Sequence, residues 1–384
     1  MNRKIHDRLC LSVLASLLAL AAATGCAPRM KTEKVVWPFP PDVARIKYVR
    51  SLSTSSDFES GLRHFWNSLA GKSPLVLLNP TAVALSPDER RLYVTNSPVG
   101  LVTVFDFAKG TLARAANVNG FKPKRPFGIA LDGDENLYVG DQSENLVWVY
   151  SAKGDFVRQI GKGMFERPVG VAFDRRRQML YVVDGGTGTS MRHRVEVFAP
   201  DGRHLRTIGS RGDGPGQFNF PSYAAVAPDG KLYVADTSNF RIEIFDADGG
   251  FVTMFGAVGE GPALFGKVKG MAFDTFGNLY VVDGQVGIVQ MFSPSLQPLM
   301  AFGGNSGRRE YMNLPTDVVI DSKNNIYVAD YAFSHVNQYA LINTSASDSE
   351  AAGAAPGAAA APAPSDTGPR PSAAAPSPAP AATR

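Results

Sequence analysis

Five aspartates recur at matching places in this chain of 384 residues, and a ring of carboxylates is a set of ligands that a metal ion can use. Each one ends a segment such as "NLYVGD" or "KLYVAD". An aspartate that opens a tight turn accepts hydrogen bonds from backbone N–H groups two or three residues later. One metal ion needs its ligands around one point, whereas this residue returns in repeat after repeat. We therefore predict a turn-forming role for Asp141, Asp184, Asp236, Asp283 and Asp330, and for Asn96, which holds the place in the first copy.

Histidine is the second residue type that could hold a metal. The chain has five histidines, and a catalytic zinc usually takes three protein ligands. His193 and His335 stand ahead of the segments "RVEVF" and "VNQY", but a third ligand would have to be His64 or His204, and neither holds a matching position. We predict solvent-exposed loop histidines and no cofactor. His193 and His335 remain the candidates for a zinc or calcium site under an enzymatic alternative.

Sequence motifs for other chemistry are missing. The glycines of "GDGPG" at 212–216 precede a predicted strand and open no helix, so they do not form a phosphate-binding loop. The acidic turn "DGDEN" at 132–136 lacks the distal glutamate of a calcium loop. The chain also has no nucleophile elbow and no HExxH motif. These observations favour a scaffold over a catalyst.

A repeat of about 45 residues positions the aspartates. Its marker is the tyrosine of the hexapeptide, and the intervals between successive tyrosines are 45, 43, 52, 47 and 47 residues. Each period contains an apolar run, a polar turn, the hexapeptide, a second turn, an alternating run and in most cases a weaker fourth run. Four short strands joined by Gly, Pro, Asp and Asn turns make one antiparallel blade. Six periods predict an all-β protein with a six-bladed β-propeller. The tyrosines are Tyr93, Tyr138, Tyr181, Tyr233, Tyr280 and Tyr327.

The last repeat lacks a fourth strand, and a matching run stands alone near the N-terminus. This run, "RIKYVRSLS" at 45–53, precedes the first repeat. An unpaired edge invites aggregation, so we predict that this run closes the ring within a propeller spanning 43–343. Between it and the first repeat, apolar residues with helical spacing predict a short amphipathic helix at about 56–70.

Both ends of the chain read as segments outside the propeller. Residues 1–25 have a basic start and a short apolar run, as a secretory signal does. The run ends in "ATGC", which resembles a bacterial lipobox, so we expect Cys26 to be lipidated, with an ordinary signal and a free thiol as the alternative. A Pro-rich linker at 26–42 would follow, and Ala27 favours the outer membrane under the sorting rule of enteric bacteria. The Ala/Pro-rich segment 344–384 has no aromatic residue and predicts a disordered tail.

The most complete repeat is "GSRGDGPGQFNFPSYAAVAPDGKLYVADTSNFRIEIFDADG" at 209–249, and it resembles the NHL repeat. The resemblance extends over 121–342 and is weaker in the first repeat. The stretch "VVWPFPPDVARIKYV" is similar to the lead-in of bacterial lipoproteins with six-bladed propellers. The resemblance implies the propeller fold. Some NHL-like propellers are amidating lyases with a channel zinc held by histidines, and related propellers include lactonases.

Basic residues gather in the segments that would link one blade to the next. Removal of the signal, which carries Asp7 and three basic residues, lowers the formal net charge from +4 to +2, so a local excess of basic residues stands out and can steer an acidic ligand. We predict a monomeric envelope scaffold that binds a protein or an anionic glycan and no nucleic acid; the alternative is a metalloenzyme. The predicted binding residues are Lys122, Lys124, Arg125, Lys162, Arg167, Arg192, Arg211, Lys267, Lys269, Arg308 and Arg309.

Overall fold

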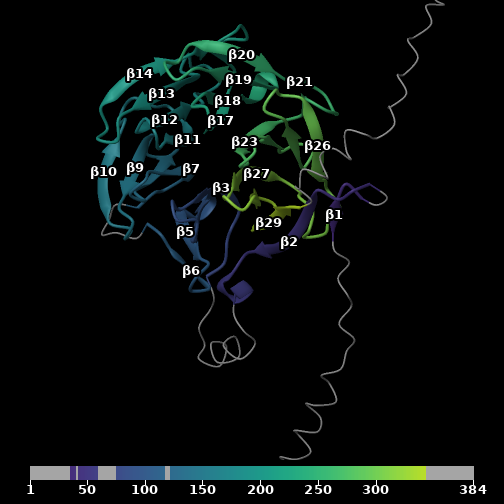
Figure 1. The fold of residues 1–384 in the computed structure, drawn as a ribbon. Coiled ribbons are helices and arrows are strands. Elements are labelled where there is room, and N and C mark those ends of the chain that lie inside the picture. Colours follow the sequence, from purple (N-terminus) through teal and green to yellow (C-terminus); the bar gives the residue numbers. More distant parts are fainter. Residues whose placement is uncertain (1–34, 40–41, 59–74, 117–121, 343–384) are drawn as a thin grey trace, which may run out of the picture. The chain divides into compact units, whose positions relative to one another are not determined.

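Six antiparallel sheets surround a central axis in the computed structural model, which describes residues 35–39, 42–58, 75–116 and 122–342 (Figure 1). The predicted all-β, six-bladed propeller is confirmed. The predicted signal, lipidation site, tail and nearly all of the predicted helix at 56–70 lie outside the described residues. In the described part of that last segment, Ser55–Phe58 forms a single 3-10 turn, η1. No helix in the described ranges is long and apolar enough to cross a membrane.

Each blade has its first strand at the axis and its fourth at the rim. Blade 1 contains β3 (Pro80–Leu85), β4 (Arg91–Asn96), β5 (Leu101–Asp106) and β6 (Thr111–Arg114). Blade 2 contains β7 (Pro126–Leu131), β8 (Leu137–Asp141), β9 (Leu146–Tyr150) and β10 (Phe156–Ile160). Blade 3 contains β11 (Pro168–Asp174), β12 (Met179–Asp184), β13 (Arg194–Phe198) and β14 (His204–Ile208).

The second half of the ring repeats this order. Blade 4 contains β17 (Pro221–Val226), β18 (Leu232–Asp236), β19 (Arg241–Phe245) and β20 (Phe251–Phe255). Blade 5 contains β23 (Val268–Phe273), β24 (Leu279–Asp283), β25 (Ile288–Phe292) and β26 (Pro298–Gly303), and blade 6 begins with β27 (Pro315–Ile320), β28 (Asn325–Asp330) and β29 (His335–Leu341). Two parallel pairs lie in links between blades: β15 (Ser210–Arg211) with β16 (Gln217–Phe218), and β21 (Ala257–Val258) with β22 (Leu264–Phe265).

The N-terminal strand closes the ring, as predicted. Strand β2 (Ile46–Leu52) pairs antiparallel with β29 and so supplies the fourth strand of blade 6. Its two ends, Ile46 and Leu52, are fully buried. Strand β1 (Val36–Trp37) adds a fifth strand outside β2, which the sequence analysis did not predict. The closed ring leaves no long unpaired edge at the junction of the two ends.

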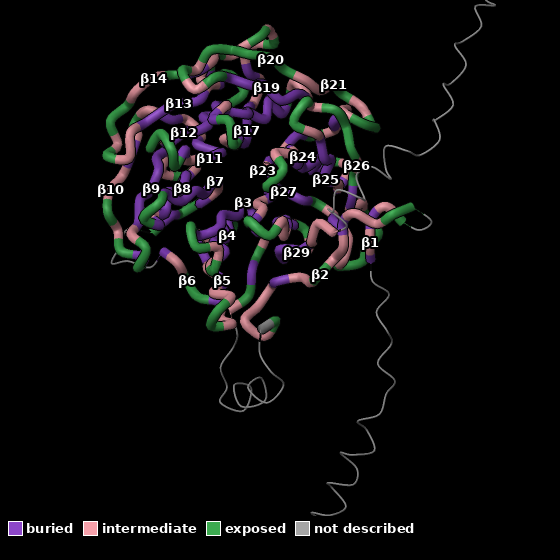
Figure 2. Tube along the Cα trace, viewed as in Figure 1, coloured by how far each residue is buried: buried purple, intermediate pink, exposed green. Residues whose placement is uncertain are grey.

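The core lies between the blades, because successive residues of a strand point to opposite faces. In β8, Leu137 and Val139 pack in one hydrophobic cluster while Tyr138 packs in another. Both faces of the hexapeptide are therefore apolar, unlike those of a sheet with one wet side. Figure 2 shows the consequence: inner strands are buried, and the rim strands β20 and β26 are largely exposed.

The inner strands of blades 2 and 3 approach so closely that only glycine fits. A Cβ added to Gly128 in β7 would lie 2.3 Å from the carbonyl oxygen of Val169 and 2.7 Å from the nitrogen of Val171. Both are backbone atoms, so the clash cannot be relieved by a side-chain rotation. Gly133 in the following turn has no atom within 4 Å of the corresponding position, and its φ is not positive. Alanine substitution at Gly128 and at Gly133 therefore separates the effect of crowding in the folded protein from the effect on the entropy of the unfolded chain.

We predict that Gly128→Ala lowers the free energy of unfolding by about 2 kcal/mol or more, because the two strands must separate. Gly133→Ala should change it by less than about 0.5 kcal/mol. Denaturant unfolding of both variants beside the parent protein measures the difference. Equal stability of the two variants would contradict the close approach of the inner strands.

Candidate functional site

The recurring aspartates are buried and tie two segments together. The Asp283 carboxylate accepts backbone N–H bonds from its own turn, at Gln285 (3.0 Å) and Val286 (3.3 Å), as the sequence analysis predicts. It also accepts the N–H groups of Gly266 (2.7 Å) and Lys267 (3.0 Å) in the link that enters the blade. This second set of bonds was missed, since the sequence shows only the local turn. The side chain of Asp283 is fully buried.

The same arrangement recurs in blades 2, 3 and 6. The predicted turn-forming role is wrong for Asn96 and Asp236, whose side chains accept no backbone N–H from the described residues of their own turns. The Asp141 carboxylate accepts N–H groups from Lys124 and Arg125 in its link, and the Asp330 carboxylate accepts those of Asn313 and Leu314. In blade 1, the Asn96 amide oxygen accepts the N–H of Leu78 at 3.1 Å. Among the described residues, no three of the types His, Cys, Asp and Glu are grouped so that they could hold a metal ion.

These bonds also orient three basic residues that immediately precede an inner strand. Arg125, Arg167 and Lys267 each donate a backbone N–H to the aspartate of their own blade. The carbonyl oxygen of each accepts the N–H of the residue after that aspartate, at 2.9 to 3.1 Å. The backbone is thus fixed at two points. The inner strand begins opposite the aspartate in the sheet, so links and turns share one end of the propeller, which we call the link face.

A cavity of about 510 Å³ opens near the start of the inner strands. Its lining includes Thr81 and Phe127, the second residues of β3 and β7, and also Arg125 and Tyr331. Lys269 is the second residue of β23 and therefore holds the equivalent position in blade 5. We define the cationic mouth as Arg125, Arg167, Lys267 and Lys269.

Electrostatic effects connect these four groups in pairs. Burial lowers the pKa of Arg167, and the nearby Arg125 lowers it further against an opposing effect of Asp184. Burial lowers the pKa of Lys269 to about 8, with Lys267 and Arg167 acting in the same direction. Arg167 therefore experiences repulsion from Arg125 and exerts repulsion on Lys269. Its guanidinium lies 5.7 Å from the centre of the Phe220 ring, and its Nη2 donates to the carbonyl oxygen of Gly185 at 3.4 Å.

The other predicted binding residues are engaged differently. Three pair with acids: Lys124 with Glu144 (2.5 Å), Arg308 with Glu310 (3.4 Å) and Arg192 with Glu166 (3.7 Å). Two bond to neutral groups: Arg211 to the carbonyl oxygen of Ser190 (2.7 Å) and Arg309 to the Ser53 hydroxyl (3.2 Å). Lys122 and Lys162 are exposed. Some of the predicted binding residues therefore make contacts within the protein, and the others are cations without an acidic partner among the described residues.

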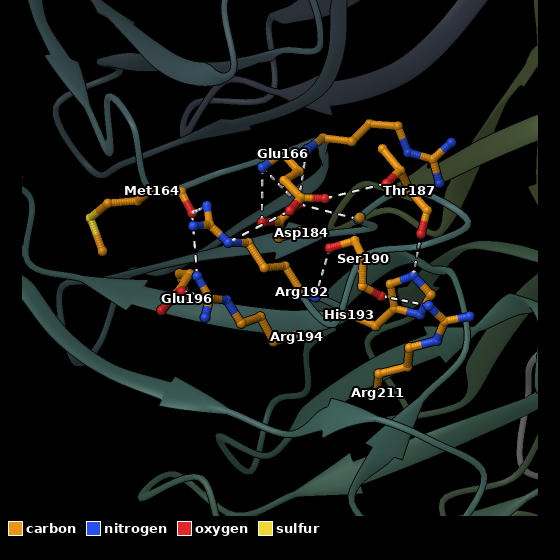
Figure 3. A network of polar contacts seen from close by, with 12 residues as sticks. Met164, Glu166, Asp184, Thr187, Ser190, Arg192, His193, Arg194, Glu196 and Arg211 are labelled. Carbon is orange, nitrogen blue, oxygen red and sulfur yellow. Dashed lines mark hydrogen bonds and ion pairs between the residues drawn. The ribbon is translucent and has the colours of Figure 1, made fainter.

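Blade 3 carries an enlarged turn on the link face. The segment 185–193 between β12 and β13 has nine residues, whereas the corresponding turns of the other five blades, such as 142–145, have four. This difference explains the long interval of 52 residues between two tyrosines. Figure 3 shows how polar contacts hold the enlarged turn: Arg192 and Arg194 both donate to the carbonyl oxygen of Met164.

The predicted exposure of His193 and His335 is wrong, since both are fully buried. The His193 Nδ1 accepts the N–H of Phe220 (3.2 Å), and its Nε2 lies 3.3 Å from the carbonyl oxygen of Thr187. His335 stacks on Phe333 and has no hydrogen-bond partner for either ring nitrogen among the described residues. Burial lowers the pKa of both rings, that of His335 to about 4. His335 begins β29 and His193 immediately precedes β13, and adjoining segments cover both positions, which a single sequence does not show.

A tyrosine divides the central channel. Tyr223 of blade 4 donates its hydroxyl to the carbonyl oxygen of Thr81 in blade 1 at 2.8 Å, and its ring lies 6.0 Å from that of Phe127. Beyond it lies a second cavity of about 700 Å³, whose lining includes Tyr223, Asp317 and Arg175. The Asp317 carboxylate accepts the N–H groups of Val83 and Val318. No polar side chain among the described residues bonds to it.

Comparisons with known proteins agree with the fold. Residues 76–186 match the SMP-30/Gluconolactonase/LRE-like region, and residues 218–245 match the NHL repeat. The second match falls within the segment that most resembles an NHL repeat in the sequence. The predicted resemblance to NHL-repeat propellers is confirmed.

Two curated relatives are NHL repeat-containing protein 2 from Gallus gallus, 26% identical over 30% of this chain, and from Homo sapiens, 27% identical over 35%. The matches span 20% and 24% of the length of those relatives. A gluconolactonase from Xanthomonas campestris is 17% identical with a TM-score of 0.56, and covers 77% of this chain and 98% of its own. A streptogramin B lyase is 12% identical with a TM-score of 0.51, over 69% and 94%. At these identities the solved structures show a common fold alone.

The buried Asp317 should make stability depend on pH. Burial raises the pKa of its carboxyl group to about 7, above the ordinary 3.8. The unfolded chain loses this proton near pH 4, whereas the folded chain keeps it. The contribution of the protonated Asp317 to folding stability is therefore complete below about pH 4 and is lost as the pH rises to about 7. We predict that the free energy of unfolding of Asp317→Asn rises relative to that of the parent protein by a few kcal/mol between pH 4 and pH 8. Urea unfolding of both proteins across this range tests it, and parallel pH profiles would contradict it.

Proposed function

We propose that this propeller is a binding module that captures an anionic partner, an acidic protein segment or a polymer, on its link face. The observation that supports this most is that the cations of the link face include several without an acidic partner among the described residues. Lys122, Arg125, Lys162, Lys267 and Lys269 form this set.

Like charges that share one face repel one another, so they destabilise the isolated protein. The positive field of the face accelerates encounter with an acidic partner, and the repulsion is relieved when the anion binds. The carboxylates nearest to these cations do not supply the relief. Asp141, Asp184 and Asp283 are fully buried and accept backbone N–H groups.

The location that we propose for this module is the bacterial cell envelope, with a lipid on Cys26 as the anchor. Support comes from the sequence alone: the basic start, the short apolar run and the "ATGC" ending. Without Cys10, which lies in the proposed signal, Cys26 is the single cysteine that remains. The outer membrane is the favoured site.

An enzymatic alternative is supported by the match to the SMP-30/Gluconolactonase/LRE-like region. The structural likeness to a gluconolactonase and a streptogramin B lyase adds to it only at the level of the fold. A metal-dependent lactonase or lyase would need ligands in the channel. Metal analysis of the purified protein separates the two hypotheses, because stoichiometric zinc or calcium would favour the enzyme.

We predict that the parent protein binds fluorescent poly-L-glutamate and that raising the salt concentration strongly weakens this binding, since screening reduces the attraction. The triple variant Lys122→Glu, Arg125→Glu, Lys267→Glu should bind at least about tenfold more weakly, because three attractive charges become repulsive. Fluorescence anisotropy measures both effects.

The matched control is the triple variant Arg90→Glu, Lys153→Glu, Lys323→Glu. These exposed residues lie in the turns that join first to second or third to fourth strands, at the opposite end of the propeller. The net charge changes by the same amount in both variants. Equal weakening in the two would show that overall charge, and not the link face, attracts the polymer.

We predict that Cys26→Ser moves the protein from the membrane fraction to the soluble periplasm or the medium, because the lipid can no longer be attached. Fractionation followed by immunoblotting measures the distribution. Should the variant stay with the membrane, the anchor hypothesis fails and the apolar run at 11–25 must be retained.

A further inference from the structure

Lys269 is an unusual residue for the interior of a propeller. It is half-buried and lies two positions after Lys267 along the same chain segment. Its stem packs on Gly284: a Cβ there would lie 3.1 Å from the Lys269 Cγ and 3.0 Å from the carbonyl oxygen of Pro315. The absence of a side chain at Gly284 thus leaves room for the lysine to lie along the channel wall.

The ammonium of Lys269 has no ion pair with any described residue. The charged groups that act on it, Lys267 and Arg167, are both cations. A half-buried lysine normally turns toward a carboxylate or toward water, because desolvation of an unpaired charge is costly. Here two further cations, Lys267 and Arg167, repel the ammonium group of Lys269.

Arg167 adds unsatisfied donors to the same place. Its Nε is buried and has no hydrogen-bond partner among the described residues, and its one described side-chain bond is the long contact to Gly185. The Phe220 ring covers the guanidinium and restrains its plane. A guanidinium with a free edge and an ammonium with three donors offer the hydrogen bonds that a carboxylate or a phosphate accepts.

The position of these donors is fixed before any ligand arrives. The backbone of Arg167 is held by Asp184 at 2.9 Å and that of Lys267 by Asp283 at 3.0 Å. Lys269 is the second residue of β23 and Arg167 immediately precedes β11, so both stand where the inner strands begin. The corresponding residues of blades 1 and 2, Thr81, Arg125 and Phe127, line the 510 Å³ cavity.

We propose that the cationic mouth binds a single terminal anionic group, a carboxylate or a phosphate, held between Lys269 and Arg167 with Arg125 and Lys267 around it. This inference rests on the proposed function and makes it more specific: the partner inserts one acidic end into the channel. The remaining cations of the link face contribute attraction at longer range.

The test uses the processed full chain with inorganic phosphate, sodium acetate and tetramethylammonium chloride as probes at constant ionic strength, followed by isothermal titration calorimetry. At least one of the two anions should bind with saturation and the cation should not. The anion that binds identifies the favoured group. Lys269→Met keeps the apolar stem over Gly284 and should weaken anion binding at least tenfold.

Lys153→Met is the matched control, because Lys153 is an exposed lysine in a turn at the opposite end of the propeller. It should leave the affinity for the bound anion unchanged. If both variants weaken anion binding equally, or if neither anion saturates a site, the single-group site is refuted. The poly-L-glutamate experiment then decides separately whether the wider link face still binds anions.

A second readout guards against misfolding of the Lys269 variant. In the parent protein at pH 8, acetic anhydride should acetylate Lys269, because burial lowers its pKa to about 8 and leaves part of its amine unprotonated; the exposed Lys162 serves as the reference. The bound anion should slow this reaction at Lys269 and leave Lys162 unaffected, as measured by peptide mass spectrometry. Slowing of both lysines alike, or of neither, would overturn the site.

Discussion

The hydrogen bonds between a buried aspartate and two backbone segments are the constraint on which the rest of this propeller depends. In blades 2, 3, 5 and 6, the carboxylate closes the turn after the second strand and holds the link that leads into the first, whereas Asp236 of blade 4 holds the link without a backbone bond to the described residues of its own turn. A single side chain thus joins segments that lie 16 to 18 residues apart, as with Asp283 and Gly266. Multiple N–H donors also offset the cost of burying a carboxylate. The hexapeptide ends in aspartate because this side chain makes these bonds.

The same bonds explain how cations can gather at the mouth without being neutralised. The buried aspartates nearest to the links face inward to backbone groups, and Arg125, Lys267 and Lys269 make no ion pair with these described residues. Glycine at 284 and the aromatic ring of Phe220 then place Lys269 and Arg167. Tyr223 closes the channel behind them. Binding at this end therefore depends on the scaffold that builds the blades.

The sequence was sufficient to predict the six blades, the turn role of four of the five aspartates and the closing strand, because each of these leaves a periodic pattern of apolar residues or a fixed interval. What it could not show was contact between distant segments. The bonds from Asp141 to its link, the burial of His193 and the closure of the channel by Tyr223 all join residues far apart in the chain. Charge alone also failed to separate Lys269 from Lys124, since only the structure shows that Lys124 has Glu144 as a partner.

We propose an anion site at the mouth of the channel, built from Lys269 and Arg167. Diffraction data from crystals soaked in selenate, collected at the selenium absorption edge, test it most directly. We predict an anomalous peak within hydrogen-bond distance of both the Lys269 Nζ and the Arg167 guanidinium, and loss of that peak in Lys269→Met crystals. Selenate bound only elsewhere on the surface, with an empty mouth, would contradict it.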